Sequence, residues 1–143
     1  MKTKLISILC VGLLLAGTTV LATSQIKQII KVLGVNAAVR QFAPDINKAI
    51  NRLSNYKDTP QAMTKVVTIY SIGISKSSAI GAAQVSGTKE QLAKVESVAS
   101  PETELFGREI RIRALIPIEG VPQGGSWKRV PGVAVTGIVD LKL

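Results

Sequence analysis

One segment of this 143-residue chain alternates strictly between apolar and charged side chains, and this alternation constrains the fold more than any other feature. The apolar positions are Ile110, Ile112, Ala114, Ile116 and Ile118, and the charged positions between them are Glu109, Arg111 and Arg113. Successive side chains of a β-strand point to opposite faces of its sheet. We therefore expect a strand over residues 105–118, with one face on the core and the other in water.

Three further segments have the composition of strands. Residues 65–75 are mostly β-branched and apolar, and the small residues 79–86 can pair with them as a hairpin. A last strand is expected over residues 132–143, where one face carries Val133, Val135, Val139, Leu141 and Leu143. Glycine and proline are frequent in residues 119–131, which predicts a loop before this strand.

Residues 23–60 are predicted to be helical, with a loop at residues 54–61 at their end. Isoleucine and leucine recur at helical spacing from Ile26 onward, and the pattern leaves open whether the helix passes Gly34 or breaks there. Pro44 suits the first turn of a second helix, because proline lacks the N–H that the interior of a helix needs.

A third helix is expected between the two pairs of strands. Thr88 followed by Gln91 is a capping box, in which each side chain bonds the backbone N–H of the other residue. An apolar stripe continues from this start to Ala99, so the helix is expected to end at the Ser100–Pro101 pair. Residues 102–104 then form a short acidic loop.

Together these elements predict one α+β domain with the element order ααββαββ. Its helical part is residues 23–60 and its sheet part is residues 61–143. The sheet is expected to be mainly antiparallel, with about four strands and with the helices on its apolar face. Hydrophobic residues make up 46% of the chain, which excludes a disordered polar chain.

The first 22 residues have the three-part pattern of a secretory signal peptide. Lys2 and Lys4 precede an apolar run over residues 5–15, and small residues follow up to Ala22. We expect cleavage after Ala22, which places residues 23–143 outside the cytoplasm, secreted or in the cell envelope. An uncleaved membrane anchor is the alternative, although this stretch is at the short end of what spans a bilayer.

The residue types that are missing limit the chemistry of the mature chain. The sequence has no histidine, and its only cysteine, Cys10, lies inside the expected signal. Cleavage would leave no disulfide, no thiol nucleophile and no histidine base, so we expect no enzyme activity, metal site or cofactor. A small hydrolase that uses serine and lysine from residues 75–78 is the least favoured alternative.

Basic residues outnumber acidic residues by 18 to 9, which gives the chain a formal charge of +9. The candidate binding residues are Arg111, Arg113, Trp127, Lys128, Arg129 and Lys142. Arg111 and Arg113 share the outer face of one expected strand, and Lys142 extends that face if the last two strands pair. Trp127 stands beside two bases in a glycine-rich segment, a combination that suits contact with a sugar or a lipid headgroup.

These residues predict a non-enzymatic binding domain for an anionic surface, either a cell-wall polymer or lipid headgroups. Nucleic acid is a weak candidate, because no nucleic-acid motif is present and export removes the chain from most of it. The alternative is a structural or assembly protein whose C-terminal strand adds to the sheet edge of a partner. The sequence does not specify an oligomeric state.

Overall fold

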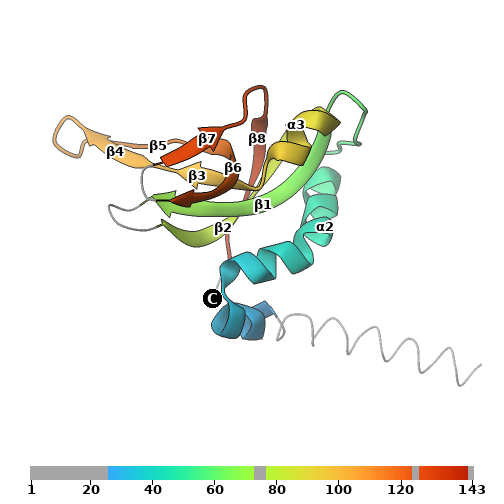
Figure 1. Ribbon diagram of the computed structural model, residues 1–143, viewed down its shortest axis with the longest axis horizontal. Helices are drawn as coiled ribbons and strands as arrows, with labels where there is room; N and C mark the ends of the chain where they lie inside the picture. The colour runs from blue at the N-terminus through green and yellow to red at the C-terminus, as the bar shows by residue number, and fades with distance from the viewer. Residues whose placement is uncertain (1–25, 73–76, 124–125, 142–143) are drawn as a thin grey trace, which may run out of the picture.

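The computed structural model describes residues 26–72, 77–123 and 126–141. The expected signal peptide, Lys142 and the first two residues of the expected turn at residues 75–78 lie outside the described residues. Figure 1 shows a curved sheet with a bent helix, α2 (Val35–Leu53), against one face. A short helix, α3 (Lys89–Lys94), packs with the cluster on the opposite face. The predicted α+β class is confirmed.

Six strands form the main sheet, namely β1 (Met63–Ile72), β2 (Ser77–Gly87), β3 (Ser97–Ser100), β6 (Ile116–Gln123), β7 (Ser126–Arg129) and β8 (Ala134–Val139). They lie side by side in the order β7-β6-β3-β1-β2-β8. β1 and β2 form the expected antiparallel hairpin, β3 runs parallel to β1, and the other neighbours are antiparallel. The sheet is therefore mixed and has more strands than predicted.

Two more strands, β4 (Glu102–Leu105) and β5 (Ile110–Arg113), pair only with each other and form a separate antiparallel ribbon. Figure 1 shows this ribbon extending away from the main sheet. The single strand expected over residues 105–118 is wrong, because the chain turns at residues 106–109 and leaves the ribbon before β6 begins. The expected acidic loop at residues 102–104 is also wrong, because these residues pair with β5.

The start of α3 is the predicted capping box. Thr88 Oγ1 accepts a hydrogen bond from Gln91 N at 3.3 Å, and Gln91 Oε1 accepts one from Thr88 N at 3.2 Å. The helix ends at Lys94 and not near Ala99, because the residues of β3 are all buried between β1 and β6. A central strand satisfies backbone groups on both of its edges, and this tertiary pairing overrides the helical pattern.

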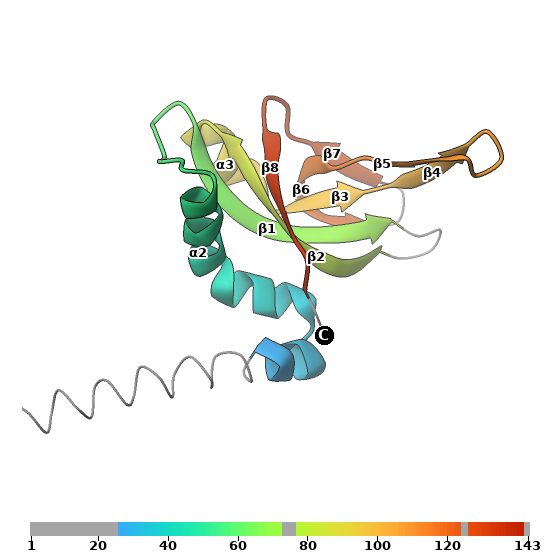
Figure 2. The ribbon, with the colours of Figure 1, turned by 180° about the vertical axis from the view of Figure 1, so that it is seen from behind.

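Residues 26–33 are helical, and Gly34 separates them from α2 with a φ of +94°. The helix therefore breaks at Gly34, where the missing Cβ permits this conformation. Pro44 lies inside α2 and does not open a second helix, which corrects the sequence prediction. Proline removes one backbone hydrogen bond and kinks a helix, and Figure 2 shows α2 bending along its length.

The core has two layers, one on each face of the main sheet. Under α2, Val39 packs with Val66 and Ala82. The other cluster joins strand residues of the opposite face to Leu92 of α3. Its buried members are Val67, Ile69, Ala83, Val85, Leu92, Val95, Val98 and Val130.

The last strand contributes to both layers, which contradicts the single apolar face predicted for it. Val135 packs against the cluster that contains Leu92, whereas Val139 packs against the cluster under α2. The pairing with β2 shifts register between Val135 and Gly137. An extra residue in one strand of a pair is a β-bulge, and it reverses the alternation of faces beyond it.

Candidate functional site

The ribbon of β4 and β5 has two chemically different faces. Its register pairs Glu102 with Arg113 and Glu104 with Arg111, so these four charged side chains share one face. The alternate positions pair Thr103 with Ile112 and Leu105 with Ile110, so the other face is mostly apolar. The ribbon is thus an amphipathic element outside the main core.

Glu102 is the centre of the charged face. Its carboxylate accepts hydrogen bonds from Arg111 Nη2 and from Arg113 Nε, each at 2.8 Å. The bond from Arg111 is the largest cause that holds the pKa of Glu102 below its usual range, and it also raises the pKa of Arg111. Near the turn, Arg108 Nε lies 3.5 Å from Glu104 Oε2. All five of these charged residues are exposed, so their ion pairs contribute little to stability.

The residues of the apolar face belong to neither core cluster, and their side chains are only partly covered. Leu105, Ile110 and Ile112 are 45%, 44% and 41% exposed, and Phe106 at the turn is 74% exposed. Ile118, which the alternation placed on the same face as Ile110 and Ile112, is fully buried in β6. The sequence pattern therefore identified apolar positions correctly but assigned two of them to the wrong environment.

Trp127, Lys128 and Arg129 lie in β7, an outer strand of the main sheet, and not in the loop predicted over residues 119–131. Lys128 is paired with Glu119 across β6 and β7, with Nζ 3.3 Å from Glu119 Oε2. Trp127 is half-buried, whereas Lys128 and Arg129 are exposed. These three residues are therefore held on a paired strand.

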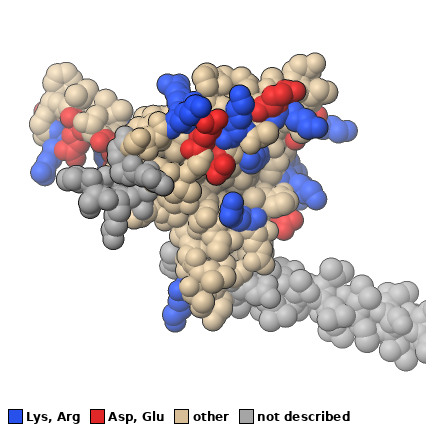
Figure 3. Space-filling view, in the orientation of Figure 1, with Lys and Arg blue, Asp and Glu red and all other residues tan. Residues whose placement is uncertain are grey.

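The structure does not join all the predicted binding residues on one strand pair. β8 pairs with β2 at one edge of the main sheet, whereas Arg111 and Arg113 lie in the separate ribbon. Lys142 was expected to extend the face of Arg111 and Arg113 only if the strand that carries them paired with the last strand, and this pairing does not form. Lys142 itself lies outside the described residues. Figure 3 shows Lys and Arg interspersed with Asp and Glu on the face it presents.

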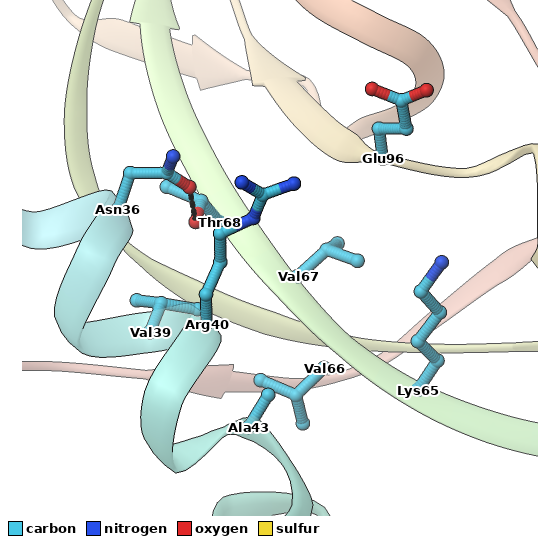
Figure 4. Close-up of a pocket in the computed structure, with 9 residues that line it drawn as sticks. All are labelled: Asn36, Val39, Arg40, Ala43, Lys65, Val66, Val67, Thr68 and Glu96. Carbon is cyan, nitrogen blue, oxygen red and sulfur yellow. Dashed lines mark hydrogen bonds between the residues drawn. The ribbon is translucent and has the colours of Figure 1, made fainter.

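A charged hollow between α2 and β1 was not identified from the sequence. It measures about 270 Å³, and Arg40, Lys65 and Glu96 line it. Figure 4 shows that these three side chains come from α2, from β1 and from the segment before β3. No sequence motif connects them, because only the pairing of β1 with β3 brings the last two near each other.

Lys65 is already engaged at the edge of this hollow. Its Nζ donates to the carbonyl oxygens of Leu92 at 3.1 Å and Val95 at 2.6 Å, so it caps the C-terminal end of α3. Burial lowers the pKa of Lys65, and the nearby carboxylate of Glu96 partly offsets this effect. With Lys65 bonded and Glu96 present, the hollow is a poor site for an anion.

In the described parts of the chain, no group of three or more acidic, cysteine or histidine side chains is placed to hold a metal ion. No helix among the described residues combines the length and the apolar character needed to cross a bilayer. The serine–lysine hydrolase candidate at residues 75–78 needs Lys76 as its base, and Lys76 lies outside the described residues.

Comparison with known proteins finds no matching family model, curated protein or solved structure.

Proposed function

We propose that this protein is an exported, non-enzymatic domain that binds an anionic lipid surface through the ribbon of β4 and β5. The observation that carries the proposal is the partly exposed apolar face of the ribbon, which ends on the largely exposed Phe106 and has arginines on the opposite face. A soluble domain usually buries such a face against another element. Its exposure in a projecting element indicates an external apolar partner.

The shape of the ribbon suits partial insertion into a bilayer interface. Phe106 lies at the turn, and Leu105 and Ile110 pair directly behind it. Apolar side chains of this kind enter the boundary between headgroups and acyl chains, while the polar part of the element stays at headgroup level. Because the ribbon extends away from the main sheet, its turn can reach the boundary before the body does (Figure 2).

The arginines supply contacts for the phosphate layer. Arg111 and Arg113 share the single carboxylate of Glu102, and each uses one nitrogen for that contact. A guanidinium group has five N–H donors, so each arginine retains donors for a phosphate oxygen. Their side chains are 68% and 49% exposed. Without Lys2 and Lys4 of the expected signal, residues 23–143 carry 16 basic and 9 acidic residues, and this formal charge of +7 attracts the mature chain to an anionic surface at low salt.

A cell-wall polymer is the other anionic surface expected from the sequence. Such a polymer offers charge but no apolar layer, so it would leave Leu105, Phe106 and Ile110 in water. The ribbon therefore favours lipid headgroups over polymer.

Sedimentation with lipid vesicles tests this proposal. The protein is expected to bind vesicles that contain phosphatidylglycerol, to bind them less at raised salt, and to bind pure phosphatidylcholine weakly. Phe106→Ser removes a side chain that is 74% exposed in the free protein, which corresponds to about 1–2 kcal/mol of apolar burial in the bilayer. Binding should weaken roughly tenfold.

Leu53→Ser is the matched control, because Leu53 is 88% exposed at the end of α2, far from the ribbon in sequence. This variant should bind anionic vesicles as the parent chain does. Equal binding to both vesicle types, or equal loss in the two variants, would refute the proposal. Binding to cell-wall sacculi without binding to vesicles would show that the surface is a polymer and that the ribbon does not insert.

The assembly function remains a second candidate because β8 is an outer strand of the main sheet. Ile138 in β8 is 57% exposed, and an outer strand offers unpaired backbone groups to a partner strand. Ile138→Lys places a charge on this strand without removing the core contacts of Val135 and Val139. An assembly that forms through β8 should dissociate in this variant when measured by light scattering, and a monomeric parent chain would contradict this function.

A further inference from the structure

A second hollow, separate from the charged one, lies where α2 ends and leaves part of the sheet uncovered. It measures about 340 Å³ and is bounded by the sheet and by the loop that follows α2. Figure 2 shows this loop joining the end of α2 to the start of β1. The side chains that matter for its chemistry are Ser54, Tyr56, Thr64, Gln84, Ser86 and Thr136.

The floor of this hollow is a row of polar side chains on neighbouring strands. Thr64 in β1 pairs directly with Ser86 in β2. Gln84 lies two residues before Ser86, and Thr136 in β8 donates a hydrogen bond to Gln84 Oε1 at 2.7 Å. The floor therefore crosses three strands and is built from hydroxyl and amide groups.

A hydrogen-bond network from α2 holds this floor in place. Gln84 Nε2 donates to Asn47 Oδ1 at 2.9 Å and to Asn51 Oδ1 at 2.7 Å. Both asparagines in turn donate to Thr64 Oγ1, at 3.0 Å and 2.9 Å. Thr64 Oγ1 donates to Asp58 Oδ1 at 2.6 Å. These bonds occupy the polar atoms of Gln84 and Thr64, so the floor is rigid before any ligand arrives.

The rim, in contrast, retains hydrogen-bonding capacity. Within the described parts of the chain, the hydroxyl groups of Ser54 and Ser86 make no hydrogen bond. Tyr56 is held by the hydrogen bond that its hydroxyl donates to the carbonyl oxygen of Ala62, and it is 37% exposed. The hollow thus combines fixed walls, an aromatic side chain and two free hydroxyl groups.

The charge of the lining selects the class of ligand. Among the described residues that line the hollow, none carries a carboxylate, ammonium or guanidinium group. The nearby carboxylate of Asp58 is already bonded to Thr64 and to Asn51. A charged ligand would lose its hydration here without gaining an opposite charge, whereas a neutral ligand with many hydroxyl groups would exchange water for serine hydroxyls. The volume is at the small end for ligand sites, which suits a single ring.

We propose that this hollow binds one neutral pyranose ring, with Ser54 and Ser86 bonding its hydroxyl groups and Tyr56 packing on its C–H surface. The ligand is either a free sugar or one unit of a glycan chain. This site is independent of the ribbon, so the two proposals can succeed or fail separately.

Amide chemical shifts of the full mature chain test the proposal directly. The probes are methyl β-D-glucopyranoside, N-acetylglucosamine, glucuronate and inorganic phosphate, together with a soluble oligosaccharide of the neutral sugar that binds. The neutral sugars should shift amides of residues 54–56, 84–86 and 136 in a saturable manner, whereas glucuronate and phosphate should not. Tighter binding of the oligosaccharide than of its monomer would identify a glycan unit as the source, and equal binding would identify a free sugar.

Ser86→Ala should weaken sugar binding several-fold, and Ser78→Ala is its matched control on the same strand but outside the hollow. Ser54→Ala supplies a second variant on a different element, in case Ser86→Ala perturbs β2. The proposal would be overturned by the absence of saturable shifts at these residues, by preferred binding of the anions, or by unchanged binding in both serine variants.

Discussion

Replacing Gln84 with methionine tests how far the polar network under α2 stabilises the fold. Methionine has nearly the shape of glutamine but cannot replace its amide hydrogen bonds. Gln84 is only 2% exposed, and its amide bonds Asn47, Asn51 and Thr136 at 2.7–2.9 Å. The substitution therefore removes three hydrogen bonds without creating a large cavity.

The expected cost follows from those three bonds. An intramolecular hydrogen bond contributes about 1 kcal/mol net, and a buried partner that loses its bond costs about 1–3 kcal/mol. Water in the adjacent hollow can rescue part of this loss at Asn51 and Thr136. We therefore expect Gln84→Met to lower the free energy of unfolding by about 2–3 kcal/mol, and Thr136→Val, which removes one of the bonds, to lower it by about 1 kcal/mol.

Urea unfolding followed by circular dichroism measures these values. For a chain of this size the larger loss corresponds to a fall of roughly 10 °C in melting temperature. Gln41→Met is the control, because Gln41 is exposed on α2, and it should change stability by less than about 0.5 kcal/mol. A loss in Gln84→Met as small as that of the control would show that the network is not a stabilising part of the fold.

Three further outcomes are expected. Gly81→Ala should destabilise the protein by about 1–3 kcal/mol in thermal unfolding. A Cβ at Gly81 would lie 2.9 Å from the backbone oxygen of Val139 and would force β2 and β8 apart. Unchanged stability would contradict this close approach of the two strands. Glu102 should titrate below the usual glutamate pKa in carboxyl-detected NMR, so its contribution to ribbon stability is present at neutral pH and is lost as pH falls through its folded pKa, whereas Glu102→Gln should abolish this dependence. Lys65→Met should free the end of α3, which faster amide exchange in residues 89–95 would reveal, while Lys94→Met should leave that exchange unchanged.

Local patterns in the sequence determined the features that depend on near neighbours. The capping box at Thr88 and Gln91 formed as predicted, because both partners lie within one helical turn. The hairpin of β1 and β2 was also predicted, since two strand-like segments are separated by a short turn. The break at Gly34 was left open by the sequence, and the structure settles it.

Features that depend on distant partners were decided only by the tertiary structure. Residues 97–100 follow a helical apolar pattern, yet they form β3 because β1 and β6 lie on either side of them. Ile112 and Ile118 occupy equivalent positions in the same alternating pattern, which predicts one common environment. The chain leaves the ribbon between them, so Ile112 is exposed and Ile118 is buried. The periodic pattern of apolar residues in the sequence indicates which side chains share a face, but it does not predict which other element will cover that face.

The candidate sites show the same division. The sequence identified Arg111 and Arg113 as neighbours on one face, because residues two apart in a strand must share a face. It did not identify Glu102 as their partner, because that contact requires β4 to pair with β5. The polar hollow was not identified at all, because its floor joins β1, β2 and β8 with α2, and no local spacing specifies which distant strands become neighbours.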